Sequence, residues 1–213
     1  MYIPLFFTAL HYIIPAVRLS GIDNALIELD YWLFGSHPTV WMEKYSHPFL
    51  TDVMILGYST FYILPLILVL PFFIQGRMGD FKRCSFIILL GYYTSYIGYF
   101  LFPALGPRFY LAHLQENPLQ GWLIYEMVSH TLNQLENIQW DAFPSGHVTI
   151  ALLFSYFAFQ YFRKLFFISL PVILLLVIST VYLRYHYVID VVAGIVLFLF
   201  CALVDRIMRK RFL

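Results

Sequence analysis

Long apolar runs separated by short polar segments dominate the whole chain. A helix needs about 20 mostly apolar residues to cross roughly 30 Å of hydrocarbon. Six stretches reach or approach that length, at 2–18, 50–74, 84–104, 146–162, 165–183 and 188–208. We therefore predict an all-α, polytopic membrane protein with about six transmembrane helices. The first stretch is short and is interrupted by Pro4, His11 and Pro15.

Two connections between these stretches carry amphipathic patterns. In 19–48 and in 118–140, apolar residues recur at helical spacing with polar residues between them. The apolar positions are Ile22, Leu26, Leu29 and Leu33 in the first, and Trp122, Tyr125, Val128, Leu132 and Leu135 in the second. Such helices lie along the headgroup layer. We interpret them either as interfacial packing or as the walls of a lipid-headgroup pocket.

Basic residues are distributed unevenly between the two predicted faces. The connections 75–83 and 163–164 and the tail 206–211 hold nine of the 13 Lys and Arg residues. The opposite face holds Arg18, Lys44, Arg108 and Arg184. By the positive-inside rule, both termini are predicted to be cytoplasmic. The other face is then periplasmic, extracellular or luminal.

Composition agrees with lipid as the solvent. Hydrophobic residues make up 61% of the 213 residues and charged residues 12%, against about 25% in soluble domains. A net charge of +1 argues against a nucleic-acid partner. We expect one membrane domain over 1–213, with its chemistry in 84–208, and the sequence defines no oligomeric state.

The first stretch lacks a basic leader and a cleavage site, so we interpret it as a retained span. Cys84 and Cys201 lie in apolar runs and read as buried hydrophobes, with no metal or cofactor site expected.

Three clusters of polar residues stand at the ends of predicted spans, all on the non-cytoplasmic face. They are 106–108 (Gly-Pro-Arg), 141–147 (Asp-Ala-Phe-Pro-Ser-Gly-His) and 184–190 (Arg-Tyr-His-Tyr-Val-Ile-Asp). Each has a bland explanation, because Ser-Gly at a helix start is usually a cap and interfacial arginines often snorkel. Ionisable groups at span ends are costly, however, and their convergence on one face indicates a functional site.

The second cluster has the features of an anion site. Ser145 and Gly146 stand where a helix begins, and unpaired backbone N–H groups and the positive end of the helix dipole attract phosphate there. His147 follows directly.

The third cluster pairs an imidazole with a carboxylate. His186 and Asp190 are four residues apart, so on a helix they share a face. A carboxylate on one imidazole nitrogen leaves the other basic, as a nucleophilic histidine requires. Arg108 and Arg184 supply forked donors suited to phosphate oxygens.

These clusters resemble the motifs of the type 2 phosphatidic acid phosphatase superfamily, which also includes vanadium haloperoxidases and sphingolipid head-group transferases. The Pro-Ser-Gly-His motif is matched in full at 144–147, and the Ser-Arg-x5-His-x3-Asp motif at Ser179, His186 and Asp190. Thr180 replaces the arginine of that motif. The Lys-x6-Arg-Pro motif is matched only loosely, with Leu101 at the lysine position and Arg108 after a proline. The segment 182–194 is also reminiscent of inositolphosphorylceramide synthases and their bacterial relatives.

The resemblance implies a metal-independent lipid phosphatase. His186 would attack the phosphorus of a lipid phosphate or diphosphate, Asp190 would orient it, and His147 would act as acid and then base. Arg108, Arg184, Ser145 and the Gly146 N–H would hold the phosphate oxygens. One alternative is a phosphotransferase that passes a phospho-headgroup to an alcohol. A second alternative is a transporter or lipid-binding protein that keeps the cluster only for binding.

Overall fold

The computed structural model describes residues 2–17, 20–135 and 139–212 and is helical throughout, with no strand in those ranges. The helices are α1 (Tyr2–Val17), α2 (Asp23–Phe34), α3 (Pro38–Met42), η1 (Glu43–Tyr45), α4 (Pro48–Ser59), η2 (Thr60–Tyr62), α5 (Leu64–Ile74), α6 (Met78–Leu101), α7 (Pro107–Tyr110), η3 (Ala112–Leu114), α8 (Tyr125–Leu135), α9 (Gly146–Tyr161), α10 (Arg163–Tyr182) and α11 (Val188–Phe212). The predicted all-α fold is confirmed.

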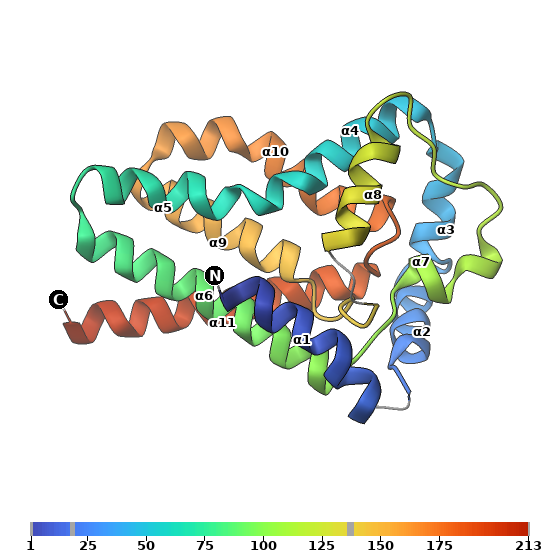
Figure 1. Ribbon diagram of the computed structural model, residues 1–213, viewed down its shortest axis with the longest axis horizontal. Coiled ribbons are helices and arrows are strands. Elements are labelled where there is room, and N and C mark those ends of the chain that lie inside the picture. Colours follow the sequence, from blue (N-terminus) through green and yellow to red (C-terminus); the bar gives the residue numbers. More distant parts are fainter. Residues whose placement is uncertain (1, 18–19, 136–138, 213) are drawn as a thin grey trace.

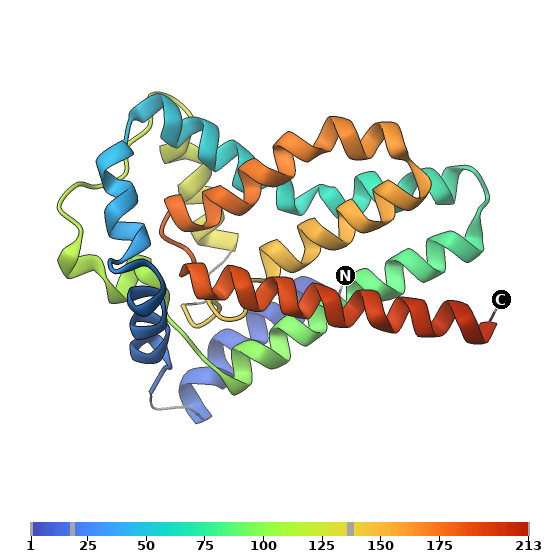
Figure 2. The ribbon, with the colours of Figure 1, turned by 180° about the vertical axis from the view of Figure 1, so that it is seen from behind.

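The long helices form a bundle, and the short helices α2, α3, α7 and α8 gather at one end of it (Figure 1). From behind, α11 runs along the face of the bundle below α10 (Figure 2). Helix α9 is central, because it packs against α5, α6, α10 and α11. Its buried side chains, among them Ile150, Leu153, Phe154 and Phe157, form the main core with residues of those four helices.

Within the part of the chain that the structure describes, three helices are long and apolar enough to cross a membrane: α6, α10 and Val188–Arg209 of α11. Helices α4 and α5 together qualify as a fourth, with a bend of 41° between them. The bend follows from Pro65 at the start of α5, which has no N–H to continue the helix. Helices α1 and α9 have only 16 residues each, so six spans remain a prediction.

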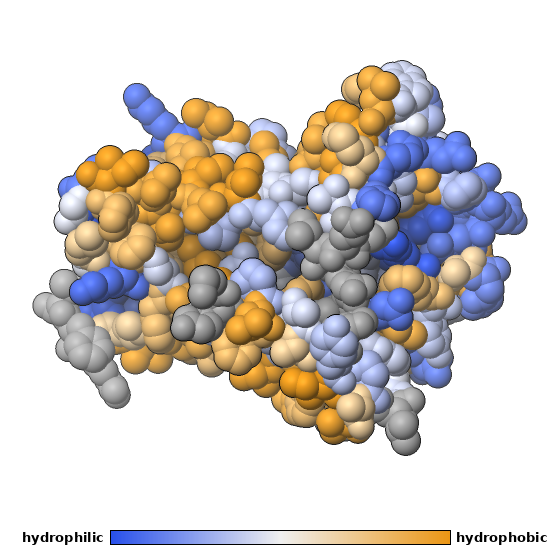
Figure 3. Space-filling model, in the orientation of Figure 1, coloured by the Kyte–Doolittle hydropathy of each residue, from blue (hydrophilic) through white to orange (hydrophobic). Residues whose placement is uncertain are grey.

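The surface of the bundle is strongly apolar. In Figure 3, hydrophobic side chains spread over α5 and the facing helices, and hydrophilic ones gather at the right-hand end, around α3 and α7. Leu66, Ile74, Phe167 and Ile168 are each more than 60% exposed. Water would not favour such a surface, so the structure supports membrane association.

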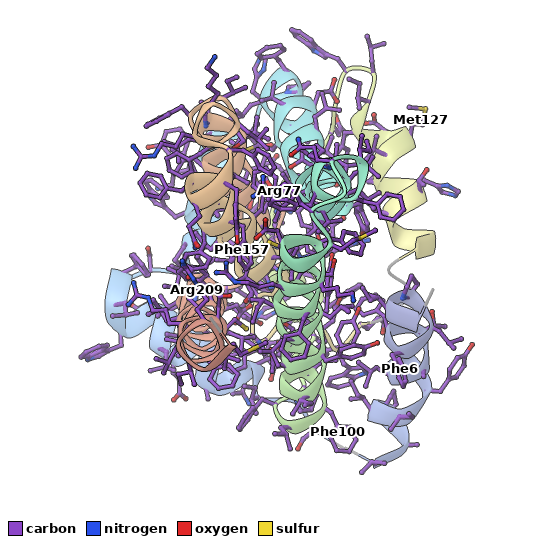
Figure 4. All side chains as sticks on the ribbon, turned by 90° about the vertical axis from the view of Figure 1, so that its left-hand side faces the viewer. Phe6, Arg77, Phe100, Met127, Phe157 and Arg209 are labelled. Carbon is purple, nitrogen blue, oxygen red and sulfur yellow. The ribbon has the colours of Figure 1, made fainter. Side chains whose placement is uncertain are left out.

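The two ends of the bundle differ in their content of basic residues, which the sequence predicts to gather on one face. Basic residues of the 75–83 and 163–164 connections and of the α11 tail lie at the left-hand end of Figure 1, opposite the short helices. Figure 4 looks onto that end, with Arg77 and Arg209 labelled. Arg18 lies outside the described residues.

The two amphipathic connections form helices at the other end. On α2, Leu26 is buried, while Leu29 and Leu33 are exposed. On α8, Leu132 is buried and Val128 packs beside it. Trp122 precedes α8 instead of lying on it, because Asp52 accepts hydrogen bonds from the N–H groups of residues 122–125 and fixes the helix start at Tyr125. Residues 136–138, the end of this predicted segment, lie outside the described residues.

Candidate active site

Two buried histidines face each other where α9 and α11 begin. His147 is the second residue of α9, and His186 stands two residues before α11. Nδ1 of His147 lies 3.5 Å from Nε2 of His186. The side chains are nearly sealed, with 8% and 3% exposure. Residues 39 positions apart therefore meet at the end of the bundle that carries the short helices.

The surroundings of His186 define which of its nitrogens carries the proton. Nδ1 lies 2.7 Å from the backbone oxygen of Ala142 and 3.5 Å from Oδ2 of Asp190. A carbonyl oxygen only accepts, so Nδ1 donates its proton there. In the neutral ring, Nε2 then carries the lone pair and points at His147. Asp190 lies beside His186 as predicted, but the carbonyl of Ala142 is the closer partner.

Asp190 has a second task at the start of α11. Its Oδ2 accepts from the backbone N–H of Tyr187 at 2.8 Å, in the manner of a capping box. Its Oδ1 has no hydrogen-bond partner among the described residues. Burial alone would lower the pKa of His186, but the hydrogen bond and charge of Asp190 outweigh it, so the pKa is raised. A raised pKa makes Nε2 a stronger base and nucleophile.

The turn into α9 uses the predicted anion-site residues, though Ser145 acts as a cap. Its Oγ accepts from the Val148 N–H at 3.4 Å, and its own N–H donates to the Asp190 carbonyl at 3.1 Å. A Cβ at Gly146 would lie 2.6 Å from the Tyr99 hydroxyl oxygen, so any larger residue there would displace the Tyr99 side chain. The N–H groups of Gly146 and His147 occupy the first turn, where no helix carbonyl can pair them. They remain candidates for holding an anion.

Arg184 serves mainly as an anchor. It adopts φ 65° in the turn between α10 and α11. Its guanidinium donates to Oε1 of Gln115 at 2.9 Å and to the carbonyl of Asn117 at 2.8 Å, and lies 3.8 Å from Glu43. Burial lowers the pKa of Arg184, although Glu43 opposes that change. The side chain therefore ties the 115–117 segment to the turn that precedes His186.

Arg108 joins Arg184 in a separate polar cavity of about 120 Å³, also lined by Gln115, Tyr125 and Ser129. The Cζ of Arg108 lies 5.4 Å from the centroid of the Tyr185 ring. Tyr185 stacks on Tyr58 at 4.6 Å, and Tyr58 stacks on His147 at 4.4 Å. The predicted site is thus divided, since two tyrosine rings stand between the arginines and the histidines.

Aromatic side chains also surround His147, and no sequence pattern predicted them. Tyr58 and Phe61 come from α4 and η2, and the Phe61 ring lies 4.0 Å from the imidazole. In a chain with 20% aromatic residues, nothing in the local pattern distinguishes these two.

Two buried aspartates of α2 were also missed as parts of the site. Asp23 accepts from the N–H groups of Leu105 and Gly106 and from the Tyr187 hydroxyl. Asp30 accepts from the N–H groups of Val188 and Ile189 at the start of α11. Their seven-residue spacing, two turns of one helix face, was the available signal. Burial raises the pKa of Asp30, although these hydrogen bonds and His37 oppose that change.

The two cysteines lie apart from this site. Cys84 and Cys201 are free thiols buried in the main core, as predicted. The part of the chain that the structure describes contains no group of three His, Cys, Asp or Glu residues that could hold a metal ion.

Fold and site together define an all-helical, membrane-associated protein with a pair of buried histidines. A family model described as the PAP2 superfamily matches residues 24–204, and the chain belongs to this superfamily. It is also similar to a Dictyostelium discoideum protein named PA-phosphatase related-family protein, with 29% identity over 123 residues. That match covers 56% of the chain and 22% of the relative, so the chain spans less than a quarter of the relative's length. No solved structure matches the chain. Members of the PAP2 superfamily are generally phosphatases.

Proposed function

We propose that this protein is an integral membrane lipid phosphatase that hydrolyses a lipid phosphate or diphosphate through a phosphohistidine on His186, without a metal ion. The observation that carries the proposal is the orientation of His186. Its Nδ1 is committed to the Ala142 carbonyl, and its Nε2 faces the second imidazole at 3.5 Å. A nucleophile with an adjacent acid–base group is the arrangement that covalent phosphoryl transfer needs.

In the first step, the Nε2 lone pair of His186 attacks phosphorus, and the bond from phosphorus to the leaving oxygen breaks. Protonated His147 gives its proton to that oxygen. The positive charge that develops on the His186 ring is stabilised by the Ala142 carbonyl and by Asp190.

In the second step, water attacks the phosphorus of the phosphohistidine. His147, now neutral, takes a proton from the water, the P–N bond breaks, and the electron pair returns to Nε2. Inorganic phosphate leaves, and both histidines regain their starting protonation states. A separation of 3.5 Å between the two ring nitrogens leaves no room for a phosphoryl group, so the rings must separate to admit it.

The phosphate oxygens are assigned first to the start of α9. The Gly146 and His147 N–H groups and the helix dipole offer positive potential beside both histidines. Arg108 and Arg184 supply charge from the neighbouring cavity, at longer range. We place the site on the periplasmic, extracellular or luminal face, because most basic residues lie at the opposite end of the bundle.

The test is phosphate release by purified protein from phosphatidate and from an isoprenyl diphosphate, with EDTA present. Wild-type protein is expected to turn over and to form an acid-labile phosphoenzyme, and His147→Gln should slow its breakdown. His186→Ala should form neither phosphoenzyme nor product. Full activity in His186→Ala, or strict dependence on an added divalent metal, would overturn the mechanism.

A second candidate function is transfer of the phosphoryl-bearing headgroup to an alcohol. The cavity of about 120 Å³ favours it, because Arg108, Gln115, Tyr125, Ser129 and Arg184 offer hydrogen-bond partners for a polyol. Both reactions share the phosphohistidine, so the products must distinguish them. A phosphomonoester of an added polyol such as inositol, formed at the expense of free phosphate, would favour transfer, because the phosphohistidine passes on only its phosphoryl group.

A further inference from the structure

An apolar cavity of about 340 Å³ lies between α1, α5, α6 and α9, and His147 forms part of its wall. It is separate from the arginine-lined cavity and shares none of its lining residues. The polarity of its wall varies with position. Asp141, Gly146 and His147 line one end, and Leu66, Ile88 and Pro4 line other parts of the wall.

The cavity is polar at one end and apolar at the other. Ser95 lies beside Gly146, since its Oγ is 3.4 Å from the position of a Cβ there. Ile88 precedes Ser95 by seven residues on α6, which is about 10 Å along the helix axis. The wall therefore changes from His147 and Asp141 at one end to aliphatic side chains two helical turns away. A lipid phosphate has the same polarity.

The cavity opens sideways, toward the surface that faces lipid. Pro4 and Leu66 line it and are themselves exposed, Leu66 by 61%. In the end-on view of Figure 4, α1 (labelled at Phe6) lies on one side of α6 and α11 on the other, with α5 above. A lipid that enters between α1 and α5 can reach His147 while its hydrocarbon chain stays in the hydrocarbon layer.

The size of the cavity limits what it can hold. An apolar cavity of about 150 Å³ accommodates one benzene molecule. By that measure, about 340 Å³ has room for roughly a dozen carbon atoms. This is one hydrocarbon chain, and a second chain has no place beside it.

We propose that this cavity binds the single hydrocarbon chain of the substrate, so that the enzyme prefers lipid phosphates with one chain and senses chain length at Ile88. The inference rests on the proposed phosphatase function and adds the substrate class. A lipid with two chains would have to leave one of them in the bilayer.

The first experiment compares straight-chain alkyl phosphates of increasing length, presented as monomers in water to the detergent-solubilised protein. We expect kcat/KM to rise about fourfold for each methylene that enters the cavity, and then to stop rising. We also expect a single-chain lipid phosphate to be preferred over phosphatidate in vesicles of the same composition. No dependence on chain length, or a preference for phosphatidate, would overturn the inference.

The second experiment moves the end of the cavity. Ile88→Phe should move the plateau to chains shorter by about one methylene, and Ile88→Ala, which removes three side-chain carbons, should extend it by about three methylenes. Leu89→Phe is the matched control, because Leu89 is the neighbouring residue, 37% exposed and not part of the cavity wall. If Ile88→Ala does not fold, Ile88→Val also enlarges the cavity and should shift the plateau toward longer chains by a smaller amount. Destabilisation lowers turnover of all substrates alike, so a shifted plateau separates the two effects.

The two proposals fail in different ways. If wild-type protein releases phosphate from no lipid phosphate, the proposed function itself fails. If it releases phosphate and His186→Ala does not, but the plateau stays fixed in every Ile88 variant, the phosphatase stands and the chain-binding cavity is wrong.

Discussion

The two ends of the bundle each bury a cluster of charged side chains, and the clusters differ in how completely their hydrogen bonds are satisfied. At the end opposite the histidines, Asp205 of α11 is fully buried and pairs with Arg83 of α6. Nε of Arg83 donates to Oδ1 of Asp205 at 2.6 Å, and its second terminal nitrogen donates to Oδ2. The Tyr156 hydroxyl adds a bond of 2.8 Å, and Tyr161 joins Arg83 to Asp80.

The histidine cluster is less completely paired. Asp190 is equally buried, yet its one contact with an ionisable side chain is 3.5 Å long, and its Oδ1 has no hydrogen-bond partner among the described residues. Buried polar groups are normally paired, because an unmade hydrogen bond is costly. The saturated network therefore holds helices together, whereas the open one keeps capacity for a ligand.

The largest effect is expected at the saturated network. Asp205→Leu leaves Arg83 with a side chain only 15% exposed and no carboxylate, which should lower the free energy of unfolding by about 3–5 kcal/mol. The double variant Arg83→Met/Asp205→Leu should recover most of that loss. Thermal unfolding in detergent measures both, with turnover per folded molecule unchanged. If Asp205→Leu lost turnover without losing stability, the Arg83–Asp205 network would not have the purely structural role inferred for it.

The reverse pattern is expected at the histidines. His186→Ala should lower kcat/KM by at least ~10²-fold while the unfolding temperature falls less than in Asp205→Leu, since the main bond lost is the one from Nδ1 to the Ala142 carbonyl. His147→Ala should behave alike. His113→Ala, an exposed histidine of η3 at the same end, is the control and should retain full activity. A large drop in unfolding temperature for His186→Ala would mean that this cluster, too, is structural.

A moderate effect is expected for Asp190→Asn. The carboxylate favours the protonated form of His186 and raises its pKa, so removing the charge lowers that pKa. Neutral, nucleophilic His186 then persists to lower pH, and the acid limb of the kcat/KM profile should move to lower pH. The rate at the optimum should fall roughly tenfold, as for groups that orient metal-bound histidines. An unmoved acid limb would remove Asp190 from the mechanism.

The smallest effect is expected at Asp30, which supports the site from α2. Asp30→Asn keeps one acceptor for the N–H groups of Val188 and Ile189 and loses the other. Because burial already raises the pKa of Asp30, the neutral amide avoids part of the carboxylate's desolvation, and the loss should stay near ~1 kcal/mol. Glu28→Gln, on the exposed side of the same helix, should change nothing. Hydrogen exchange at residues 186–190 measures the local loosening.

The parts of the site that the sequence predicted are those set by short-range geometry. His186 lies two residues before α11, yet Asp190 in the first turn of that helix reaches it at 3.5 Å, and Ser145 and Gly146 begin α9 because their residue types favour a helix start. The contact between His147 and His186 needed the tertiary fold, and only the family motifs pointed to it. The apolar runs predicted at 165–183 and 188–208 coincide with α10 and with the apolar part of α11 to within a few residues, because apolar runs of this length mark such helices.

The positions of the arginines could not be predicted in this way. Arg184 is held by Gln115, Asn117 and Glu43, which lie at least 67 residues away in the chain, and no local pattern encodes such partners. The same holds for the Tyr58 and Tyr185 rings that separate the arginines from His147. The predicted span at 50–74 is in fact two helices joined at a bend, because Pro65 interrupts the hydrogen-bond ladder without interrupting the apolar run.

Helix α2 also sets an order of events during biosynthesis. Its carboxylates at Asp23 and Asp30 leave the ribosome long before the segments that they bind, at 105–106 and 187–189. Until those segments arrive, the two side chains must remain hydrated at the edge of the bilayer, because a bare carboxylate is not stable in hydrocarbon. Only the insertion of α11 delivers the last backbone partners. The bundle can therefore begin to assemble early, but the end that holds the histidines closes only with the final helix, because a nascent chain that stalls before residue 187 still lacks the Val188 and Ile189 N–H groups that Asp30 binds.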